Sequence, residues 1–321
     1  MRTTVIIGGG LSGLVAAYTL QNHNIPYTLI EVKRRVGGAI STVRQNGFVM
    51  DGGPSLINHE EGQQLYPFLD SLHIGDELFE AKHGLSLRSG MQILTDTLDM
   101  KLTGGRLHRM AVSSIGQIGR IFTICMENGL MFDARSLIVA VPARYAERIF
   151  YGYIPEISEL LMDYRYDTIA RLSLGYANEH LPTELKVSAQ KYPFVYRFSG
   201  PPRAPTGYSL LHIGVRLTPP IKLEADEIIA NAIKDLNLSP APTVWHLDYW
   251  PEADPLNVYD AQHAQDMMAI SELLPGGVAL IGNDYAPTSL QQNGIYRIMK
   301  RIQLAQEAAR GIANYLGATR N

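Results

Sequence analysis

Three glycines near the start of the chain have the spacing of a dinucleotide-binding turn. Gly8, Gly10 and Gly13 form a G-x-G-x-x-G pattern between an apolar run and a helix-forming run. Such glycines allow a tight turn, bring backbone amides close to a pyrophosphate and point a helix N-terminus at the phosphates. Glu31 stands eighteen positions after Gly13, near the spacing of about 20 residues expected for an acid that accepts hydrogen bonds from ribose hydroxyls. These residues predict a dinucleotide site.

Side chains that could act as nucleophiles, proton carriers or metal ligands form no comparable pattern. The nine histidines show no H-x-x-x-H spacing, and the chain has no G-x-S-x-G elbow. We interpret His59, His83, His212 and His246 as surface or hydrogen-bonded core residues. Cys125 is the only cysteine, lies in an apolar run and is interpreted as a small core residue. We therefore name no catalytic residue, expect no metal site, and expect any redox chemistry to come from a cofactor.

The elements that must hold the glycine turn are predicted on both sides of it. Apolar runs indicate a strand over 5–7, a helix over 14–20 and a second strand over 27–30. Asn128-Gly129 is a hairpin signal in a β-rich region typical of a meander. Further strands are predicted over 110–115, 120–126, 129–132, 136–141 and 277–285, and helices over 59–75, 91–102, 142–150 and 293–316.

From residue 155 to residue 274 the sequence holds most of the prolines and alternates strands with helices. The strands are predicted near 166–176, 192–198, 207–215 and 243–249, and the helices near 224–236 and 261–273. The predicted fold class is therefore α/β: a three-layer Rossmann-like domain with a parallel sheet and a β-meander, joined to a second, sheet-based α+β domain.

The two predicted domains interleave along the chain. The first, which would bind the nucleotide, is discontinuous over 1–58, 89–150 and 275–321. The second, over 59–88 and 151–274, would cover the site as a substrate domain. A small-molecule substrate between the two domains follows from this arrangement.

Composition narrows the class of protein. The chain has 321 residues, 46% hydrophobic and 18% charged, with a formal net charge of −3, so no basic footprint for nucleic acid is present. No apolar run reaches about 18 residues, so no transmembrane segment is expected. The first strand begins too near Met1 for a signal peptide, which makes a cytoplasmic protein the expectation. Peripheral membrane contact stays open, since an apolar patch assembled in three dimensions leaves no linear signature.

Further motifs resemble a known family. A Gly37-Gly38 doublet follows Glu31, and a second glycine turn occupies 47–54. Residues 133–142 end in Ala-x-Pro, 249–255 contain W-x-x-A-x-P, and 273–283 read Leu-Leu-Pro-Gly-Gly-Val-Ala-Leu-Ile-Gly-Asn. This order resembles the flavin-containing amine oxidase superfamily, most closely its protoporphyrinogen-oxidase-type members, over nearly the whole chain.

The resemblance implies that FAD lies along the first domain. The pyrophosphate would face the glycine turn, the adenosine ribose the region of Glu31 and Lys33, and the flavin the second glycine turn and the closing motif. The residues that the resemblance implies as cofactor contacts are Gly8, Gly10, Leu11, Ser12, Gly13, Glu31, Lys33, Gly37, Gly38, Ala39, Gly53, Pro54, Val112, Trp250, Gly282 and Asn283.

Several positions depart from the family pattern or allow a second interpretation. Ala39 stands where many amine oxidases have an arginine, and the segment from Gly53 to Ser89 is short. The closing helix carries Lys300-Arg301 where the family has a small Ser-Gly pair. Lys33 belongs to a basic run that could equally be solvated surface. Trp250, and likewise Tyr285 after the closing motif, could be core residues.

The resemblance implies an FAD-dependent oxidoreductase that takes a hydride from a C–N or C–C bond of a small organic substrate. The protein would supply binding, orientation and electrostatics, because the cofactor carries the chemistry. Neither the substrate nor the electron acceptor follows from the sequence. Two alternatives are a non-catalytic or partner-dependent FAD-binding protein and an NAD(P)-dependent dehydrogenase that uses the same glycine turn.

Overall fold

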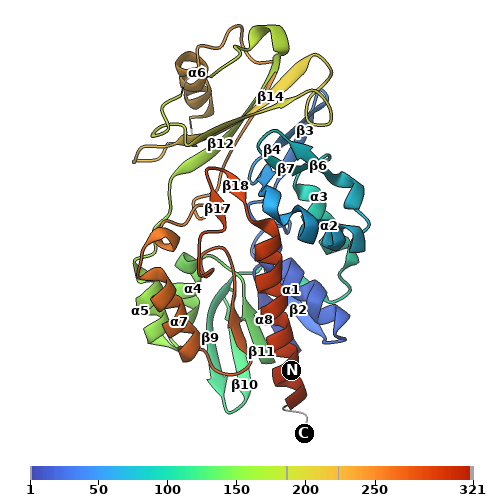
Figure 1. Ribbon diagram of the computed structural model, residues 1–321. Coiled ribbons are helices and arrows are strands. Elements are labelled where there is room, and N and C mark those ends of the chain that lie inside the picture. The colour runs from blue at the N-terminus through green and yellow to red at the C-terminus, as the bar shows by residue number, and fades with distance from the viewer. Residues whose placement is uncertain (1, 186, 223, 319–321) are drawn as a thin grey trace.

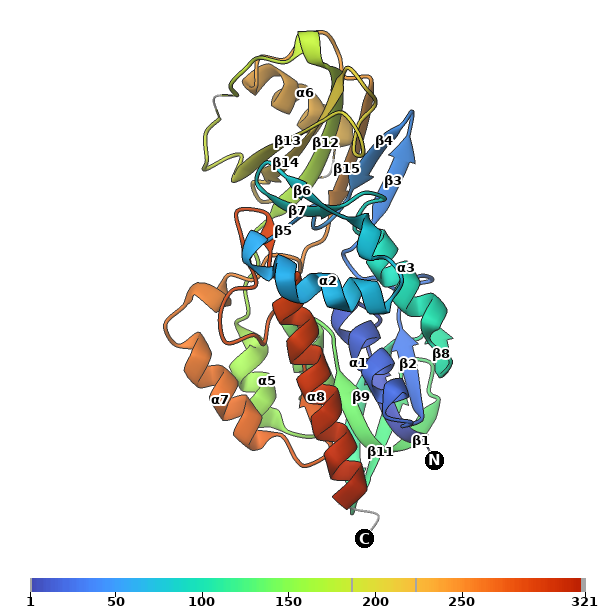
Figure 2. The same cartoon turned by 45° about the vertical axis from the view of Figure 1, so that its right-hand side comes forward.

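The computed structural model describes residues 2–185, 187–222 and 224–318. Met1 and residues 319–321, which the sequence assigned to the first domain, lie outside this description. The chain forms two tiers, with the helices α1 (Leu11–Asn22) and α8 (Ile298–Ala318) adjacent in the lower tier and α6 (Ala225–Asp235) on the upper one (Figure 1). Figure 2 shows α2 (Gly62–Ser71) lying across the upper end of α8. Within the described residues, no helix is both long enough and apolar enough to cross a membrane.

The lower tier is built on a seven-stranded sheet in the order β8-β2-β1-β11-β10-β9, with β16 also paired to β11. Strands β8, β2, β1, β11 and β16 are parallel, and β9 and β10 continue from β11 as an antiparallel meander. β2 is buried along its whole length, as expected for a parallel strand covered on both faces. The strands are Arg2–Ile7 (β1), Tyr27–Glu31 (β2), Gly105–His108 (β8), Val112–Ile118 (β9), Ile121–Met126 (β10), Met131–Val139 (β11) and Val278–Leu280 (β16).

Helices cover both faces of this sheet. One hydrophobic core contains α1 (Leu11–Asn22), α2 (Gly62–Ser71), α3 (Gln92–Lys101) and α8 (Ile298–Ala318). The other contains α4 (Ala143–Phe150), α5 (Pro155–Met162) and α7 (His263–Leu273). In α4 the buried residues are Ala143, Ala146, Ile149 and Phe150, a helical spacing that places one apolar stripe against the sheet. The predicted three-layer arrangement around a parallel sheet is confirmed.

Two small sheets lie at the junction of the tiers. One is the β3–β4 hairpin, and the other has five strands in the order β17-β18-β5-β7-β6. Their strands are Thr42–Gln45 (β3), Phe48–Asp51 (β4), Leu56–Ile57 (β5), Leu78–Ala81 (β6), Gly84–Leu87 (β7), Gln291–Gln292 (β17) and Ile295–Tyr296 (β18). The second sheet pairs a strand from early in the chain with one from near its end, since β5 and β18 are parallel neighbours.

The upper tier is a four-stranded antiparallel sheet in the order β13-β14-β12-β15. Its elements are Ile169–Ala177 (β12), Phe194–Ser199 (β13), Tyr208–Arg216 (β14), Val244–Tyr249 (β15) and the helix Ala225–Asp235 (α6). Leu172 and Leu174 of β12 share a hydrophobic core with α6. Arg171 and Ser173 lie on the opposite face of the sheet, because successive side chains of a strand alternate. The prediction of a second, sheet-based unit is confirmed.

The bounds of several predicted elements differ from those of the structure. The predicted strands 129–132 and 136–141 form the single strand β11, because the residues between them pair with β1 and β10. The helix predicted over 59–75 is a 3-10 turn followed by α2, and it ends before His73, whose φ is 64°. The closing helix begins at Ile298 because the chain just before it forms the β17–β18 hairpin.

The hydrophobic packing bears on the division into domains. Leu65 of α2 lies in the core shared with α1 and α8, and Leu161 of α5 and Ile270 of α7 lie in the core on the other face of the same sheet. The sequence had placed these helices in the substrate domain, over 59–88 and 151–274. We propose that α2, α5 and α7 belong to the nucleotide-binding tier and that the region from β12 to β15 alone forms the second domain.

Candidate functional site

The predicted cofactor residues meet at one edge of the lower sheet. Parallel strands β8, β2, β1, β11 and β16 all end there, and in open α/β sheets this carboxyl edge is where ligands bind. The chain stays paired just beyond the strands: Gly8 N donates to Ile30 O at 2.8 Å and Ala140 N donates to Ile7 O at 2.7 Å. Along this edge Glu31 ends β2, the glycine turn follows β1, and Gly282 and Asn283 follow β16.

Two of the three glycines in the turn are required by the backbone, and the third leaves space. Gly8 has a φ of +105°, and a Cβ on Gly13 would lie 1.9 Å from Gly8 O. A Cβ on Gly10 would meet no atom nearer than Gly38 Cα at 4.0 Å, so this glycine faces open space. Leu11 and Ser12 are buried in the first turn of α1, and no side chain caps that turn. Its free amides therefore present an anion site to the edge.

Glu31 is held firmly at the end of β2. Its Oε2 accepts a hydrogen bond from Gly9 N at 2.7 Å, and its Oε1 accepts one from Lys33 N at 2.8 Å. The residue is buried. Because an ionised carboxylate has about four acceptor positions, roughly two remain for ribose hydroxyls. Met110 N donates to Glu31 O at 3.1 Å, which brings Val112, at the start of β9, into the same region.

Lys33 and Trp250, expected at the two ends of the cofactor, are in contact. Lys33 Nζ lies 3.4 Å from the centroid of the Trp250 ring, a cation–π arrangement. The backbone of Lys33 remains at Glu31 while its long side chain reaches the turn after β15. Burial lowers the pKa of Lys33, and the negative charge of Glu31 opposes that effect. Lys33 therefore links the two tiers and is more than a solvated surface residue.

The remaining glycines allow backbone segments to stack on one another. Gly37 N donates to Gly9 O at 2.7 Å, and a Cβ on Gly38 would lie 3.2 Å from Gly10 Cα. A Cβ on Gly53 would lie 2.0 Å from Ala39 O. Pro54, next in sequence, is buried. The doublets thus bring the chain from 37 to 54 against the glycine turn, where a side chain would separate them.

Asn283 connects the end of β16 to α8 and to the turn after β15. Its Oδ1 accepts Arg301 Nη2 at 2.9 Å, and its Nδ2 lies 3.5 Å from Ala253 O. The next residue, Asp284, is buried and accepts hydrogen bonds from Ala143 N at 2.8 Å and from Tyr166 Oη. Burial raises the pKa of Asp284 to about 6. Gly282 and Asn283 are therefore placed by a polar network.

Tyr285 belongs to the same network and shows no free hydroxyl. Its Oη donates to Val141 O at 2.7 Å, and burial raises its pKa well above the ordinary value. The hydroxyl ties the turn after β16 to the end of β11. Tyr285 therefore stabilises the carboxyl edge of the sheet through this hydrogen bond.

Three buried polar atoms near the expected flavin end have no hydrogen-bond partner among the described residues: Trp250 Nε1, His246 Nε2 and Arg301 Nε. Tyr176 Oη and Arg203 Nε are also buried and unpaired. Buried polar groups in native proteins are nearly always paired, so each such atom calls for an explanation. A ligand that offers carbonyl and phosphate oxygens would accept from Trp250 Nε1 and Arg301 Nε, and from His246 Nε2 in the tautomer that carries its proton there. Together with the open Gly10 and the uncapped α1, these atoms fit a nucleotide cofactor along the edge.

The upper sheet turns a polar face toward this edge, which the sequence interpretation missed. Ser173 is paired across the strands with His212 and His246, and Arg171 is paired with Asp248. Asp248 Oδ2 accepts Ser41 Oγ at 3.0 Å and lies 3.9 Å from His246 Nε2. The two histidines had been interpreted as surface or satisfied core residues. The period-two alternation of β12 and β15 is the signal that could have placed them together.

His212 is one of these inward residues and is neutral. Burial lowers its pKa to about 3, and its Nδ1 lies 3.5 Å from Ser173 Oγ. His246 is less buried. Since His246 also stands nearer to Asp248, it is the histidine of this face that is better placed to exchange a proton.

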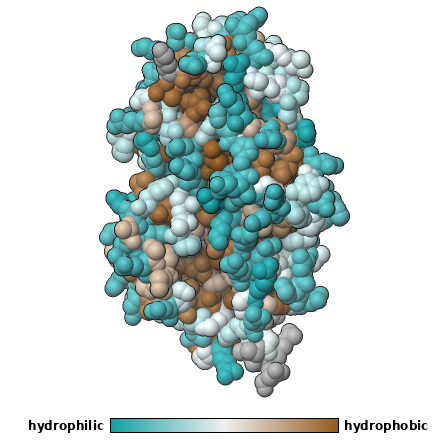
Figure 3. Space-filling view, viewed as in Figure 1, coloured by the Kyte–Doolittle hydropathy of each residue, from teal (hydrophilic) through white to brown (hydrophobic). Residues whose placement is uncertain are grey.

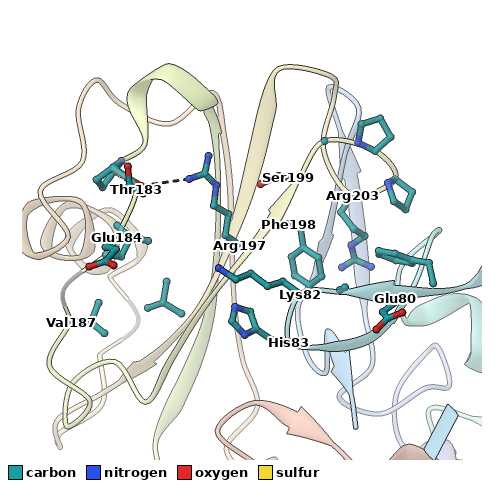
Figure 4. Close-up of a pocket in the computed structure, with 18 residues that line it drawn as sticks. Glu80, Lys82, His83, Thr183, Glu184, Val187, Arg197, Phe198, Ser199 and Arg203 are labelled. Carbon is teal, nitrogen blue, oxygen red and sulfur yellow. Dashed lines mark hydrogen bonds between the residues drawn. The ribbon is translucent and has the colours of Figure 1, made fainter. Parts of the chain in front are cut away.

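Two cavities lie away from the edge. One, of about 760 Å³, opens between the β6–β7 hairpin and β13, where Lys82, His83 and Arg197 line it (Figure 4). The other, of about 530 Å³, lies between α7, β16 and α8, where Figure 3 shows apolar surface. None of the predicted cofactor residues lines either cavity, although Ile281 and Tyr285, which flank Gly282 and Asn283, line the second.

The fold and the edge define a class: a Rossmann-type dinucleotide-binding tier whose nucleotide edge faces a second, antiparallel sheet. A family model described as an NAD(P)-binding Rossmann-like domain matches residues 6–72.

The relatives in sequence include porphyrinogen oxidases. Mitochondrial protoporphyrinogen oxidase of Nicotiana tabacum is 33% identical over 76 residues, which are 24% of this chain and 15% of that protein. Coproporphyrinogen III oxidase of Bacillus subtilis (strain 168) is 45% identical over 59 residues, 16% of this chain and 13% of that protein. The matched segments thus span only a small part of these relatives.

One solved structure extends the likeness to the whole fold. A protein of Exiguobacterium sp. 255-15, provisionally described as a protoporphyrinogen oxidase, has a TM-score of 0.78 and 14% identity, covering 98% of this chain and 99% of that one. At such identity the likeness shows the fold alone. The resemblance to protoporphyrinogen-oxidase-type proteins stated from the motifs is confirmed at this level of distant similarity.

Proposed function

We propose that the protein is an FAD-dependent oxidoreductase of the amine-oxidase and protoporphyrinogen-oxidase type, acting on a C–N or C–C bond of a small organic substrate. The observation that carries this proposal is the carboxyl edge of the parallel strands β2, β1 and β16. There Glu31, the glycine turn and Asn283 face the polar side of a second sheet. A bound flavin would supply the hydride acceptor. Every other task falls to the protein.

The residues divide along the edge. The uncapped amides of Leu11, Ser12 and Gly13 would bind the pyrophosphate, and Glu31 would bind the ribose through its remaining lone pairs. Trp250 Nε1, which is buried without a partner, would donate to the ring end of the cofactor.

The substrate side is formed by the upper sheet. Asp248 accepts from Ser41 and stands beside His246, so this pair would orient a polar substrate and hold a proton at His246 Nε2. A Cβ on Gly52 would lie 2.3 Å from Asp248 Oδ2, which places the carboxylate directly against the second glycine turn. The apolar face of the same sheet is covered by α6, and this packing keeps water from the back of the site.

The test is the identity of the cofactor. The purified protein should show a flavin absorption spectrum, or acquire one on incubation with FAD, and denaturation should release FAD that chromatography identifies. A protein that never binds flavin contradicts the proposal, and recovery of NAD would indicate the dehydrogenase instead. Reduction of the bound flavin under anaerobic conditions by amines, porphyrinogens or reduced nicotinamides then defines the substrate class.

A second candidate is an FAD-binding protein without oxidoreductase activity. The Lys33–Trp250 contact joins the tiers across the edge. This contact favours a site closed to substrate. Stoichiometric FAD that no compound in the panel reduces, while dithionite does, would favour this candidate.

A further inference from the structure

We propose that Arg301 is a cofactor-contacting residue, whose guanidinium binds a negatively charged oxygen of the bound dinucleotide. The inference rests on the proposed function and adds a residue that the family pattern does not supply, since small residues are expected at this point of the helix. The anionic oxygen belongs to the pyrophosphate or to the flavin ring when the ring carries negative charge. Both sources are parts of one ligand, and the experiment below separates them.

Arg301 stands at the cofactor edge. It lies in the first turns of α8 and donates from Nη2 to Asn283 Oδ1 at 2.9 Å. Asn283 follows β16, the last of the parallel strands along the edge. Glu31, at the end of β2, is three strand spacings away from this point: β2 to β1, β1 to β11 and β11 to β16. At about 4.8 Å each, these spacings amount to roughly 14 Å. Arg301 is thus beyond the ribose site, toward the expected flavin.

The guanidinium is short of partners. Its Nε is buried and unpaired, and Arg301 forms no ion pair with any described carboxylate. Burial lowers the pKa of Arg301, and Tyr296, Asp284 and Glu61 oppose that effect. A cation taken from water without a counter-ion is costly, because desolvation is not repaid by a neighbouring negative charge.

Two fully buried arginines, Arg171 and Arg203, differ from the half-buried Arg301 in having a carboxylate partner. Arg203 Nε, like Arg301 Nε, has no hydrogen-bond partner among the described residues. Arg171 donates to both oxygens of Asp254, at 2.5 and 2.7 Å, and to Tyr296 Oη at 2.6 Å. Arg203 donates to Asp51 and also to Leu87 O at 2.9 Å. Each has a carboxylate of its own.

The nearby carboxylates are already engaged. Glu61 caps the N-terminus of α8, since its two oxygens accept Met299 N at 2.9 Å and Lys300 N at 3.0 Å. Asp284 accepts Ala143 N and Tyr166 Oη. Neither carboxylate is within ion-pair distance of Arg301, so an anionic ligand is the partner that we propose for its guanidinium.

The experiment compares Arg301→Met with a matched control, Arg297→Gln. Arg297 lies one helical turn earlier, is half exposed and forms only a 3.7 Å ion pair with exposed Glu60. FAD, ADP and riboflavin are titrated into each protein with fluorescence detection. We expect Arg301→Met to weaken FAD about tenfold, which is 1.4 kcal/mol, and Arg297→Gln to change it less than about twofold.

The separate ligands locate the contact. A loss for ADP but not riboflavin assigns Arg301 to the pyrophosphate. A loss for riboflavin but not ADP, with a lower two-electron reduction potential of the bound flavin, by about 30 mV for each tenfold change, assigns it to the ring. Unchanged affinity for all three ligands together with an unchanged potential overturns the proposal.

Thermal unfolding distinguishes this role from a structural one. Removing an unpaired buried charge should leave the melting temperature of the cofactor-free protein unchanged or higher, while the increase caused by FAD becomes smaller. A lower melting temperature without FAD and an undiminished increase with FAD would show a structural role instead, and Arg301→Lys provides a charge-retaining variant if the Met protein fails to fold. If the wild-type protein binds no FAD, the proposed function itself fails, and this outcome is visible before any variant is measured.

Discussion

Replacing Asp284 by Asn should change how the stability of the protein depends on pH. Asp284 is 3% exposed, and burial raises its pKa from 3.8 to about 6, although Ala143 N and Tyr166 stabilise the charge. The unfolded chain releases this proton near pH 4, whereas the folded chain keeps it until about pH 6. The stabilisation that Asp284 contributes is therefore fully present below the pKa of the unfolded chain and is lost as pH rises through the pKa of the folded chain.

The magnitude follows from the two pKa values. A pKa of Asp284 that is higher by roughly two in the folded state contributes about 3 kcal/mol to the free energy of unfolding at low pH. About 1.3 kcal/mol of this contribution should be lost between pH 5 and pH 7. Asn cannot ionise and keeps one oxygen acceptor, so the variant should lack this loss. Other groups titrate in both proteins, and the difference between the two proteins isolates Asp284.

The assay is urea denaturation followed by circular dichroism at pH 5 and pH 7, for the wild type, Asp284→Asn and the exposed control Asp163→Asn. The wild type and the control should each lose about 1.3 kcal/mol more than Asp284→Asn over this interval. Equal losses in all three proteins would show that Asp284 ionises normally and would refute the account of its burial.

Three further outcomes are expected. Glu31→Gln keeps the shape of the side chain but removes the negative charge of the group that accepts hydrogen bonds from Gly9 N and Lys33 N. FAD affinity should fall at least about tenfold in a fluorescence titration with the fold retained, since hydrogen bonds to a charged group contribute about 1.5–3 kcal/mol. Unchanged affinity would show that Glu31 does not contact the cofactor. Gly13→Ala puts a Cβ 1.9 Å from a backbone oxygen and should lower the free energy of unfolding by about 1–3 kcal/mol in urea denaturation. The control Gly116→Ala, where a Cβ would meet nothing within 4 Å, should show no steric penalty. Equal effects of the two substitutions would contradict the packing argument. Asp51→Asn strands the buried guanidinium opposite it and should lower stability by about 3–5 kcal/mol, so a melting temperature equal to that of the wild type would contradict the role of that ion pair.

The nucleotide half of the site was predictable because its determinants are local. Gly8, Gly10 and Gly13 act through their own backbone and their nearest neighbours, so their spacing in the sequence is already the geometry of the turn. Glu31 is likewise fixed by one strand and the residues beside it. Parallel order of the strands then follows from helix-linked connections.

The substrate half was not predictable in the same way. His246 and Asp248 can be assigned to the site only once β15 is known to pair with β12 and that face of the sheet is known to lie toward the edge. Arg301 was noted as a departure in the closing helix, but its lack of a partner depends on Glu61, 240 positions earlier, capping that helix. Such facts depend on long-range packing, which a pattern of residue types along one chain does not encode.

The buried charges indicate how the upper sheet is kept over the edge. Arg171 of β12 reaches Asp254 in the turn after β15, and Gln291 of β17 donates to the same carboxylate at 2.6 Å. Arg203, just after β13, reaches Asp51 at the end of β4. Buried ion pairs add little net stability, but they are directional and costly to break, so these two fix the position of one tier against the other. Where the chain positions its own tiers, each guanidinium has a carboxylate; at Arg301, on the edge where the ligand is expected, the carboxylate is missing, and that contrast is the strongest physical reason to expect an anionic ligand there.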